Sequence, residues 1–252
     1  MKKKDVDIYG FYIQQKEICL QCLSSYSGSK EQLHRLRVAI KKIKAVFKLT
    51  NAVHKKFKYK KAFAPYRAVF KTAGPIREEQ LLEEKLTALI KAGKAQRRAV
   101  IINRLNQKFR KQVSVDMDSI NHEAGKTEKR LGALSHKKIS VYCGSLFKKL
   151  RKGWPKLQTE KDYHEVRKEL KQLQYCVQLL SKSERKGVIS AKELLRLDEL
   201  QETIGKWHDD ILVLNKLSQS EEVVPDDFVT TLQEETRALR YAFLKTGNKL
   251  LK

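Results

Sequence analysis

Apolar side chains recur every three or four residues through most of this chain, and this spacing is the strongest constraint on its fold. Such a period places apolar side chains on one face of an α-helix, and only four prolines interrupt it. The chain is therefore predicted to be all-α. The expected helices cover residues 8–26, 31–50, 60–73, 78–122, 136–152, 161–182, 190–204, 207–219 and 226–250. Gly93 is the expected place for any break in the fourth.

The two halves of the sequence share a pattern, which predicts an internal duplication. A shift of 130 residues places the His34-x-x-Arg37 segment over His164-x-x-Arg167 and keeps polar and apolar positions in register. A shift of 131 places residues 74–78 over residues 205–209. We therefore expect one domain made of two repeats, at about residues 1–126 and 127–252. Each repeat should form a bundle of about four helices, with pseudo-twofold symmetry between the two.

The charge balance predicts a polyanionic partner. The chain holds 54 Lys and Arg against 29 Asp and Glu, a net charge of +25, and a field of that size concentrates anions around the protein. Residues 1–126 carry 29 basic and 11 acidic residues, whereas residues 127–252 carry 25 and 18. The first half is expected to bind anions more strongly. Lysine outnumbers arginine and aromatic residues are only 8%, which suits phosphate contacts better than base stacking.

A basic stripe is predicted on the helix that begins near residue 31. At 100° per residue, His34, Arg37, Lys41, Lys44 and Lys48 fall on one side, and the apolar residues fall on the other. An exposed helix face ordinarily mixes both signs of charge. From Arg35 to Lys48, however, there are six Lys and Arg and no acid. A solvated face is the ordinary explanation of a basic stripe, but this one repels itself and favours an anionic ligand.

The second helix repeats the stripe with less charge. His164, Arg167 and Lys171 lie on one side, but Gln174 stands where the first helix has Lys44. Glu165 and Glu169 lie in or beside the stripe and are expected to pair with neighbouring cations. A single histidine at a helix start is commonly a boundary residue without a ligand. Because a histidine recurs at the same place in both halves, a ligand-binding role is given the same weight as that structural role. Protonated histidines would bind phosphate more strongly, which predicts a mild pH dependence.

Catalytic and metal-binding patterns are absent from the sequence. There is no phosphate-binding loop, no dinucleotide fingerprint and no carboxylate cluster for Mg²⁺, so we expect no enzymatic activity, cofactor or metal. The pair Asp209-Asp210 is assigned to capping or ion pairing at a helix start. No secretory signal or membrane span is expected, so the protein is predicted to be cytoplasmic. Reduced core thiols are expected at Cys19, Cys22, Cys143 and Cys176.

These motifs resemble a known family. The resemblance lies in three segments, namely His34-x-x-Arg37-Val38-Ala39-Ile40-Lys41-Lys42-Ile43-Lys44, then Gly74-Pro75-Ile76-Arg77-Glu78, and then the His164 helix with Gly205-x-x-His208-Asp209. Together they resemble the conserved histidine α-helical domain, CHAD. The likeness spans nearly the whole chain. It implies two pseudo-symmetric four-helix bundles with a basic central groove or pore that binds inorganic polyphosphate, and an association with polyphosphate granules. Glu78 departs from the aspartate usual at that position.

The resemblance and the basic stripe together give the expected phosphate-binding residues. They are His34, Arg37, Lys41, Lys42, Lys44 and Lys48, with His164, Arg167 and Lys171, and with Arg77 and His208. The last two are expected at a helix N-terminus, whose free amides attract anions. Six other basic residues either line the same groove or are solvated, and the sequence leaves both possibilities open. They are Arg97, Arg98, Arg104, Lys108, Arg237 and Arg240. The alternative is a nucleic-acid-binding protein, which would stack bases on Phe57, Tyr59 and Phe63 within the lysine-rich stretch.

Overall fold

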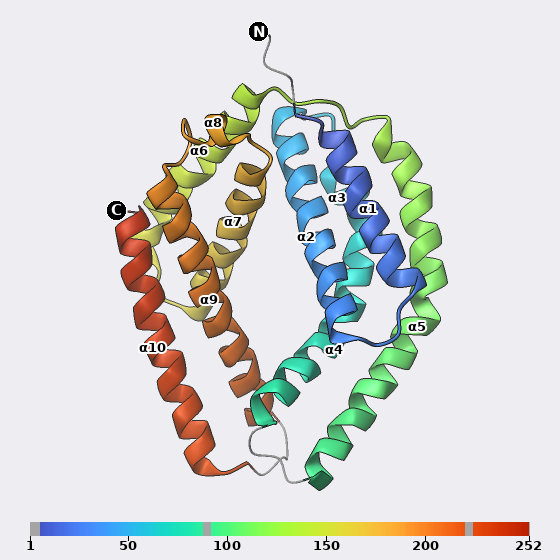
Figure 1. The fold of residues 1–252 in the computed structure, drawn as a ribbon, viewed down its shortest axis with the longest axis vertical. Coiled ribbons are helices and arrows are strands. Elements are labelled where there is room, and N and C mark those ends of the chain that lie inside the picture. Colours follow the sequence, from blue (N-terminus) through green and yellow to red (C-terminus); the bar gives the residue numbers. More distant parts are fainter. Residues whose placement is uncertain (1–5, 88–91, 220–223, 252) are drawn as a thin grey trace. The chain divides into compact units, whose positions relative to one another are not determined.

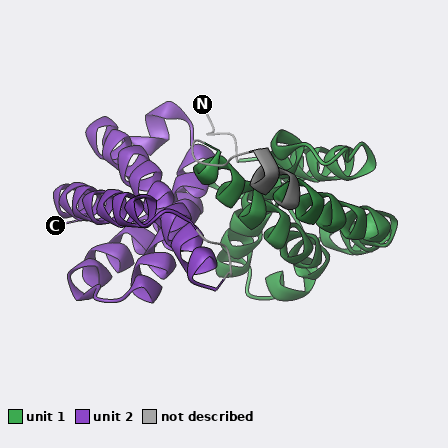
Figure 2. Ribbon diagram, turned by 90° about the horizontal axis from the view of Figure 1, so that it is seen from below, with its two compact units in different colours: residues 1–135 green, residues 136–252 purple. Residues whose placement is uncertain are grey.

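The computed structural model describes residues 6–87, 92–219 and 224–251, and it leaves out the side chains of residues 92–97. Across these ranges the fold is all-α, with ten α-helices, one 3-10 turn and no strand (Figure 1). The all-α prediction is confirmed. The chain divides into two compact units, residues 1–135 and residues 136–252, which are coloured separately in Figure 2.

In its described residues, the first unit contains four long helices and one short helix. They are α1 (Ile8–Ser24), α2 (Lys30–Val53), α3 (Tyr59–Ala62), α4 (Ala64–Leu86) and α5 (Ala92–Glu128). Asp7 begins α1 by accepting a hydrogen bond from the Gly10 amide at 2.8 Å, and Ser29 caps α2, as expected for N-cap residues. Between the helices, the hydroxyls of Tyr12 and Tyr66 are hydrogen-bonded at 2.9 Å within the core.

The second unit also contains four long helices. They are α6 (His136–Gly153), α7 (Glu160–Gln178), α9 (Ala191–Ser218) and α10 (Asp226–Leu251), with a 3-10 turn at Trp154–Lys156 and the short α8 (Lys182–Arg185). Three aromatic rings form the centre of its core. Tyr163, Trp207 and Phe243 pack edge to face, with ring centroids 5.2 to 5.4 Å apart. This core joins α7, α9 and α10.

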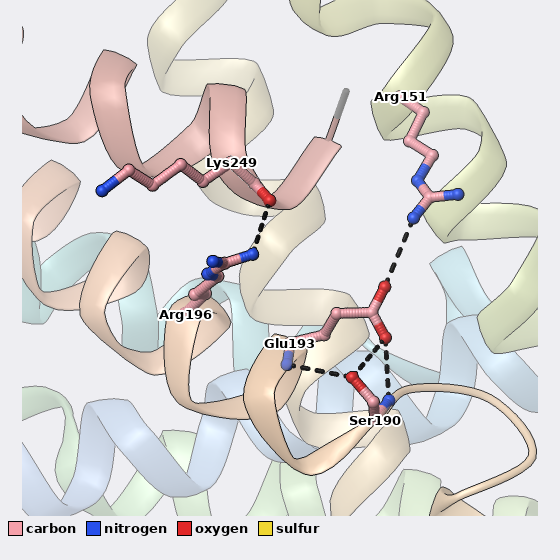
Figure 3. A network of polar contacts seen from close by, with 5 residues as sticks. All are labelled: Arg151, Ser190, Glu193, Arg196 and Lys249. Carbon is pink, nitrogen blue, oxygen red and sulfur yellow. Dashed lines mark hydrogen bonds and ion pairs between the residues drawn. The ribbon is translucent and has the colours of Figure 1, made fainter.

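Polar contacts fix the start of α9 against its neighbours (Figure 3). Ser190 and Glu193 form a reciprocal capping box, in which the Ser190 amide donates to the Glu193 carboxylate at 2.8 Å. Glu193 also accepts from Arg151 of α6 at 3.3 Å. Arg196, one turn further along, donates to the backbone oxygen of Lys249 at 2.9 Å. The first turns of α9 are thereby tied to both α6 and α10.

Two helix breaks predicted from glycine are wrong. The breaks were expected near residues 74–77 and 205–206, but α4 and α9 run through these positions without interruption. Proline inside a helix costs about 3 kcal/mol and glycine about 1 kcal/mol. In α4 the flanking Ala73 and Ile76 are fully buried, and in α9 Ile204 and Trp207 are buried. Burial of the apolar face on both sides of each break outweighs the local cost.

The other helix boundaries agree with the prediction to within four residues, with three exceptions. The helix expected from residue 60 is divided at Phe63 between α3 and α4, α5 ends at Glu128 rather than residue 122, and the short α8 was not expected. The helix α4 ends at Leu86 and α5 begins at Ala92, and residues 88–91, just before the break expected at Gly93, lie outside the described residues. The arrangement of the helices as two four-helix bundles stays a prediction. The internal duplication and its boundary near residue 126 stay predictions.

All four cysteines are buried and none forms a disulfide, which confirms their expected place in the core. Burial raises the pKa of Cys19 and that of Cys22, so both remain thiols. Within the described ranges, no helix has the length and the apolar character needed to cross a membrane.

Candidate functional site

The helix α2 has the two faces that its sequence predicts. Its apolar residues Leu33, Leu36, Ile40, Ile43 and Phe47 are fully buried. The opposite side carries the expected cations. His34 is exposed, and the five basic side chains are half-buried, namely Arg37, Lys41, Lys42, Lys44 and Lys48. One side of α2 therefore belongs to the core of the first unit, and the other is a cationic surface that solvent still reaches.

Aromatic rings near or within α4 lie under the cationic side of α2. The guanidinium carbon of Arg37 lies 4.0 Å from the centroid of the Phe70 ring, and Arg37 also donates to the Phe70 backbone oxygen at 3.1 Å. The ammonium of Lys41 lies 5.9 Å from the same ring. Lys44 lies 5.7 Å from the ring of Phe63, which directly precedes α4. Each cation is thus placed over a ring face.

This aromatic support orients the cations without neutralising them. A cation over an aromatic ring gains roughly 0.5 to 1 kcal/mol at a solvent-exposed site, whereas the ring carries no net charge. The ring therefore holds the side chain of Arg37 in one place and adds no negative charge beside it. Sequence reasoning did not predict this support. Phe63 and Phe70 are seven residues apart, which is two helical turns, and that spacing is the signal that could have indicated it.

In the second unit, the structure brings two predicted residues into direct contact. His164 of α7 and His208 of α9 are hydrogen-bonded, with 2.7 Å between Nδ1 of His164 and Nε2 of His208. Only one proton can lie between two imidazole nitrogens at this distance. The rings are also close, with centroids 4.7 Å apart. Each histidine was predicted as a site residue, but the contact between them was not.

Arg167 and Lys171 continue the site along α7, and acids of α9 face them. Burial lowers the pKa of Arg167, and the charge of Asp209 works in the opposite direction. Burial and the nearby Arg167 lower the pKa of Lys171, while Asp198 raises it. Lys171 donates to Gln174 at 3.0 Å, and Gln174 donates to Asp198 at 2.6 Å. The cations of α7 therefore have acids beside them, and their net field is weaker.

The acids within the second motif form the ion pairs that were predicted for them. Glu165 pairs with Lys168 of the same helix, and Glu169 pairs with Lys149 of α6. Both pairs are largely solvent-exposed, so each contributes little to stability. Their effect is on the local field, because each carboxylate offsets one positive charge next to the site.

The burial of His164 predicts a loss of stability in acid. Burial lowers the pKa of His164, with Lys168 and Arg167 adding to the shift and Glu165 opposing it. The unfolded chain then takes up this proton at a higher pH, near the ordinary histidine value of about 6.5. Stability should therefore be fully present above that value and fall as the pH drops through the lowered pKa.

Chemical denaturation at several pH values measures this effect. His164→Gln should lose less stability than the wild type between neutral pH and pH 5. His122→Gln on α5 is the matched control, because His122 is exposed, and it should behave like the wild type. An unchanged pH dependence in His164→Gln would show that this histidine does not titrate as described.

Two site assignments need correction. Arg77 and His208 were expected at helix N-termini, but both lie inside helices, α4 and α9, because these helices run through the predicted breaks. Neither residue therefore has free backbone amides beside it. Arg77 donates to Glu84 at 3.1 Å. The pair Asp209-Asp210 also lies within α9 rather than at its start, and Asp210 is buried at 1% exposure, so helix capping is not its role.

The basic residues left open by the sequence have different surroundings. Arg98 is buried and paired with Glu79 at 3.4 Å, so it belongs to the core of the first unit. Arg240 donates to the Tyr163 hydroxyl at 3.1 Å. The exposed members are Arg104, Lys108, Arg237 and Arg240. The side chain of Arg97 lies outside the described residues.

The aromatic residues that would serve a nucleic-acid-binding protein point away from solvent. Phe57 is 3% exposed and Phe63 is 7% exposed. Phe57 packs on Phe47 with ring centroids 5.4 Å apart, and Phe63 stacks on Tyr66. Only Tyr59 remains half-exposed. This lysine-rich stretch therefore offers charge and a single accessible ring, Tyr59, for base stacking. Among the residues that the structure describes, no group of three or more His, Cys, Asp and Glu could hold a metal ion.

Comparisons with known proteins agree on one family. The model of the CHAD domain family matches residues 21–218, which is more than half of the chain. The chain is similar to the crystal structure of the CHAD domain from the plant Ricinus communis, with a TM-score of 0.63 and 17% identity over 98% of this chain and 92% of that one.

It is also similar to PptA from Streptomyces chartreusis, with a TM-score of 0.65 and 15% identity over 96% of this chain and 99% of that one. At these identities the likeness concerns the fold alone. No curated protein matches the sequence. The match to the family model covers both motif helices, α2 and α7, and the chain belongs to the CHAD domain family, which is known for polyphosphate binding.

Proposed function

We propose that this protein binds inorganic polyphosphate, without catalysis, through the basic faces of α2 and α7. The observation that carries the proposal is the cationic side of α2. It presents Arg37, Lys41 and Lys44 over aromatic rings, in a stretch from Arg35 to Lys48 that has no acid. The properties of the family and the net charge of +25 support the same ligand.

The chemistry of the ligand fits this surface. Polyphosphate carries a regular row of negative charges and no bases, so it can be held by cations alone. Arginine can bind two phosphate oxygens at once, whereas lysines act as movable point charges. As with nucleic-acid backbones, binding should release the counterions condensed on the polymer. Phe70 supports this by holding Arg37 and Lys41 beside each other on the surface.

The two units should contribute unequally. In α2 the stripe has four Lys and Arg, at Arg37, Lys41, Lys44 and Lys48, and Lys42 lies beside it. In α7 the matching residues are Arg167 and Lys171, and Asp209 and Asp198 act on their charges. Most of the affinity is therefore assigned to the first unit. In the cell, a protein with this activity would be expected in the cytoplasm at polyphosphate granules.

A salt titration tests the proposal. Binding of long-chain polyphosphate to the purified protein is measured by calorimetry at several salt concentrations. If the five cations of the α2 face each contact a phosphate, the slope of log K against log salt should be roughly −3.5, from about −0.7 per contact on a flexible single chain. The phosphate content of the ligand should stay unchanged after incubation. No measurable binding, or release of orthophosphate, would contradict the proposal.

A further inference from the structure

We propose that the segment from His54 to Lys61, called here the 54–61 segment, is a second contact site for the polyphosphate chain. It follows α2 directly and would continue the basic face beyond the end of the helix. The inference rests on the proposed function and deepens it, because it adds a site that the motif helices do not contain. The segment carries five lysines and one histidine in eight residues, without an acid.

The acid-free stretch is much longer than the α2 motif. Between Glu31 and Glu78 there is no Asp or Glu, while there are fourteen Lys and Arg. The lysines of the 54–61 segment are all exposed, namely Lys55, Lys56, Lys58, Lys60 and Lys61. In the described part of the chain, none of these five forms an ion pair with an acid. Five like charges this close repel one another, and a bound anion would relieve the repulsion.

The segment is held in place by its aromatic residues. Phe57 inserts into the core against Phe47, and its amide donates to the His54 carbonyl at 2.8 Å. At the other end, the Phe63 amide donates to the Tyr59 carbonyl at 2.8 Å, and the Phe63 ring stacks on Tyr66. Since the apolar rings face inward from both ends, the lysines between them are left on the outside.

The 54–61 segment is continuous with the basic face of α2. The Lys44 ammonium lies 5.7 Å from the centroid of the Phe63 ring, and Phe63 comes two residues after Lys61. Phe57 packs on Phe47, which is next to Lys48 on α2. The Lys61 end of the segment therefore lies near Lys44 of the stripe, and Phe57 anchors the middle of the segment to the buried side of α2. A linear polyanion on α2 would reach these lysines without leaving positively charged surface.

The same geometry favours a phosphate chain over other polyanionic surfaces. Stacking of nucleic-acid bases requires exposed aromatic faces, and docking to a membrane surface gains from apolar side chains that enter the lipid interface. Phe57 and Phe63 are buried, so they can provide neither. A chain of phosphates without bases or acyl groups needs only the lysines.

The test compares two variants of the whole protein that lose equal charge. The first replaces Lys55, Lys56, Lys58, Lys60 and Lys61 with glutamine. The control replaces five exposed lysines of the second unit with glutamine, at Lys137, Lys148, Lys152, Lys156 and Lys186. Glutamine keeps the side-chain length and a helix propensity close to that of lysine, and circular dichroism checks the fold of both.

The first variant should bind long-chain polyphosphate about fivefold to tenfold more weakly than the control at the same salt concentration, with a shallower salt dependence. Equal affinities for the two variants would overturn the inference, and the proposed function would still stand if the wild type binds. A loss of binding that appears only with single-stranded RNA, or only with anionic lipid vesicles, would also overturn it and assign the segment to that partner. Absence of binding by the wild type would instead reject the proposed function.

Discussion

Replacing Arg37 and Lys41 together with alanine is expected to weaken binding of long-chain polyphosphate roughly a hundredfold. Each charged hydrogen bond contributes about 1.5 to 3 kcal/mol, so two such bonds amount to at least about 3 kcal/mol, and every 1.4 kcal/mol is a factor of ten. The two side chains share the Phe70 ring as their support. We expect them to act on neighbouring phosphates, and calorimetric titration measures the loss.

The matched control is the double variant Lys129→Ala, Arg130→Ala. Both residues are exposed in the turn that follows α5, and the variant loses the same charge and the same residue types. Its affinity should fall by much less, since only the general field of the protein changes. Similar losses in the two double variants would mean that the α2 face has no special role.

The corresponding pair in α7 provides a comparison between the units. Arg167→Ala with Lys171→Ala should weaken binding less than the α2 pair does, because Asp209 and Asp198 already act on these charges. Arg167 is largely surrounded by protein, so the fold of this variant must be checked by circular dichroism. A larger loss than that of the α2 pair would reverse the assignment of affinity between the units.

The helical fold could be predicted because the apolar period is strong and few residues interrupt it. The errors concern single residues with a local preference against helix. Gly74, Pro75 and Gly205 indicated breaks, yet the flanking side chains Ile76 and Trp207 are buried, and tertiary packing overrides the local preference. Burial of that kind depends on which helices become neighbours, and the local sequence does not contain this information.

In the candidate site, too, the features set by helical spacing could be predicted, and those set by tertiary packing could not. The two faces of α2 follow from helical spacing, so the exposed and buried sides were predicted correctly. The support of Arg37 by Phe70 and the contact between His164 and His208 join residues 33 and 44 positions apart. Such pairs depend on how α4 packs on α2, and α9 on α7. The wrongly predicted helix starts also led to wrong roles for single residues. Arg77 and Asp209 were given roles that only a residue at a helix terminus can have.

Selectivity for polyphosphate over nucleic acids is expected to be at least about tenfold. In the described part of the chain, the lysine-rich stretch keeps Phe57 and Phe63 buried and leaves only Tyr59 half-exposed, so bases gain little of the stacking energy, which is worth about 1 to 3 kcal/mol per base in single-strand binders. The bases would still have to be placed beside a surface that offers only charge. A chain of phosphates carries the same charge and has no bases that must be placed beside the surface.

The most direct test is a competition experiment at one fixed salt concentration. Labelled long-chain polyphosphate is bound to the protein and displaced by unlabelled polyphosphate, RNA or DNA, each at matched total charge. The account predicts that RNA and DNA need at least about ten times more charge than polyphosphate for the same displacement. Equal displacement by all three polymers would contradict it, because the protein would then be a binder of polyanions in general.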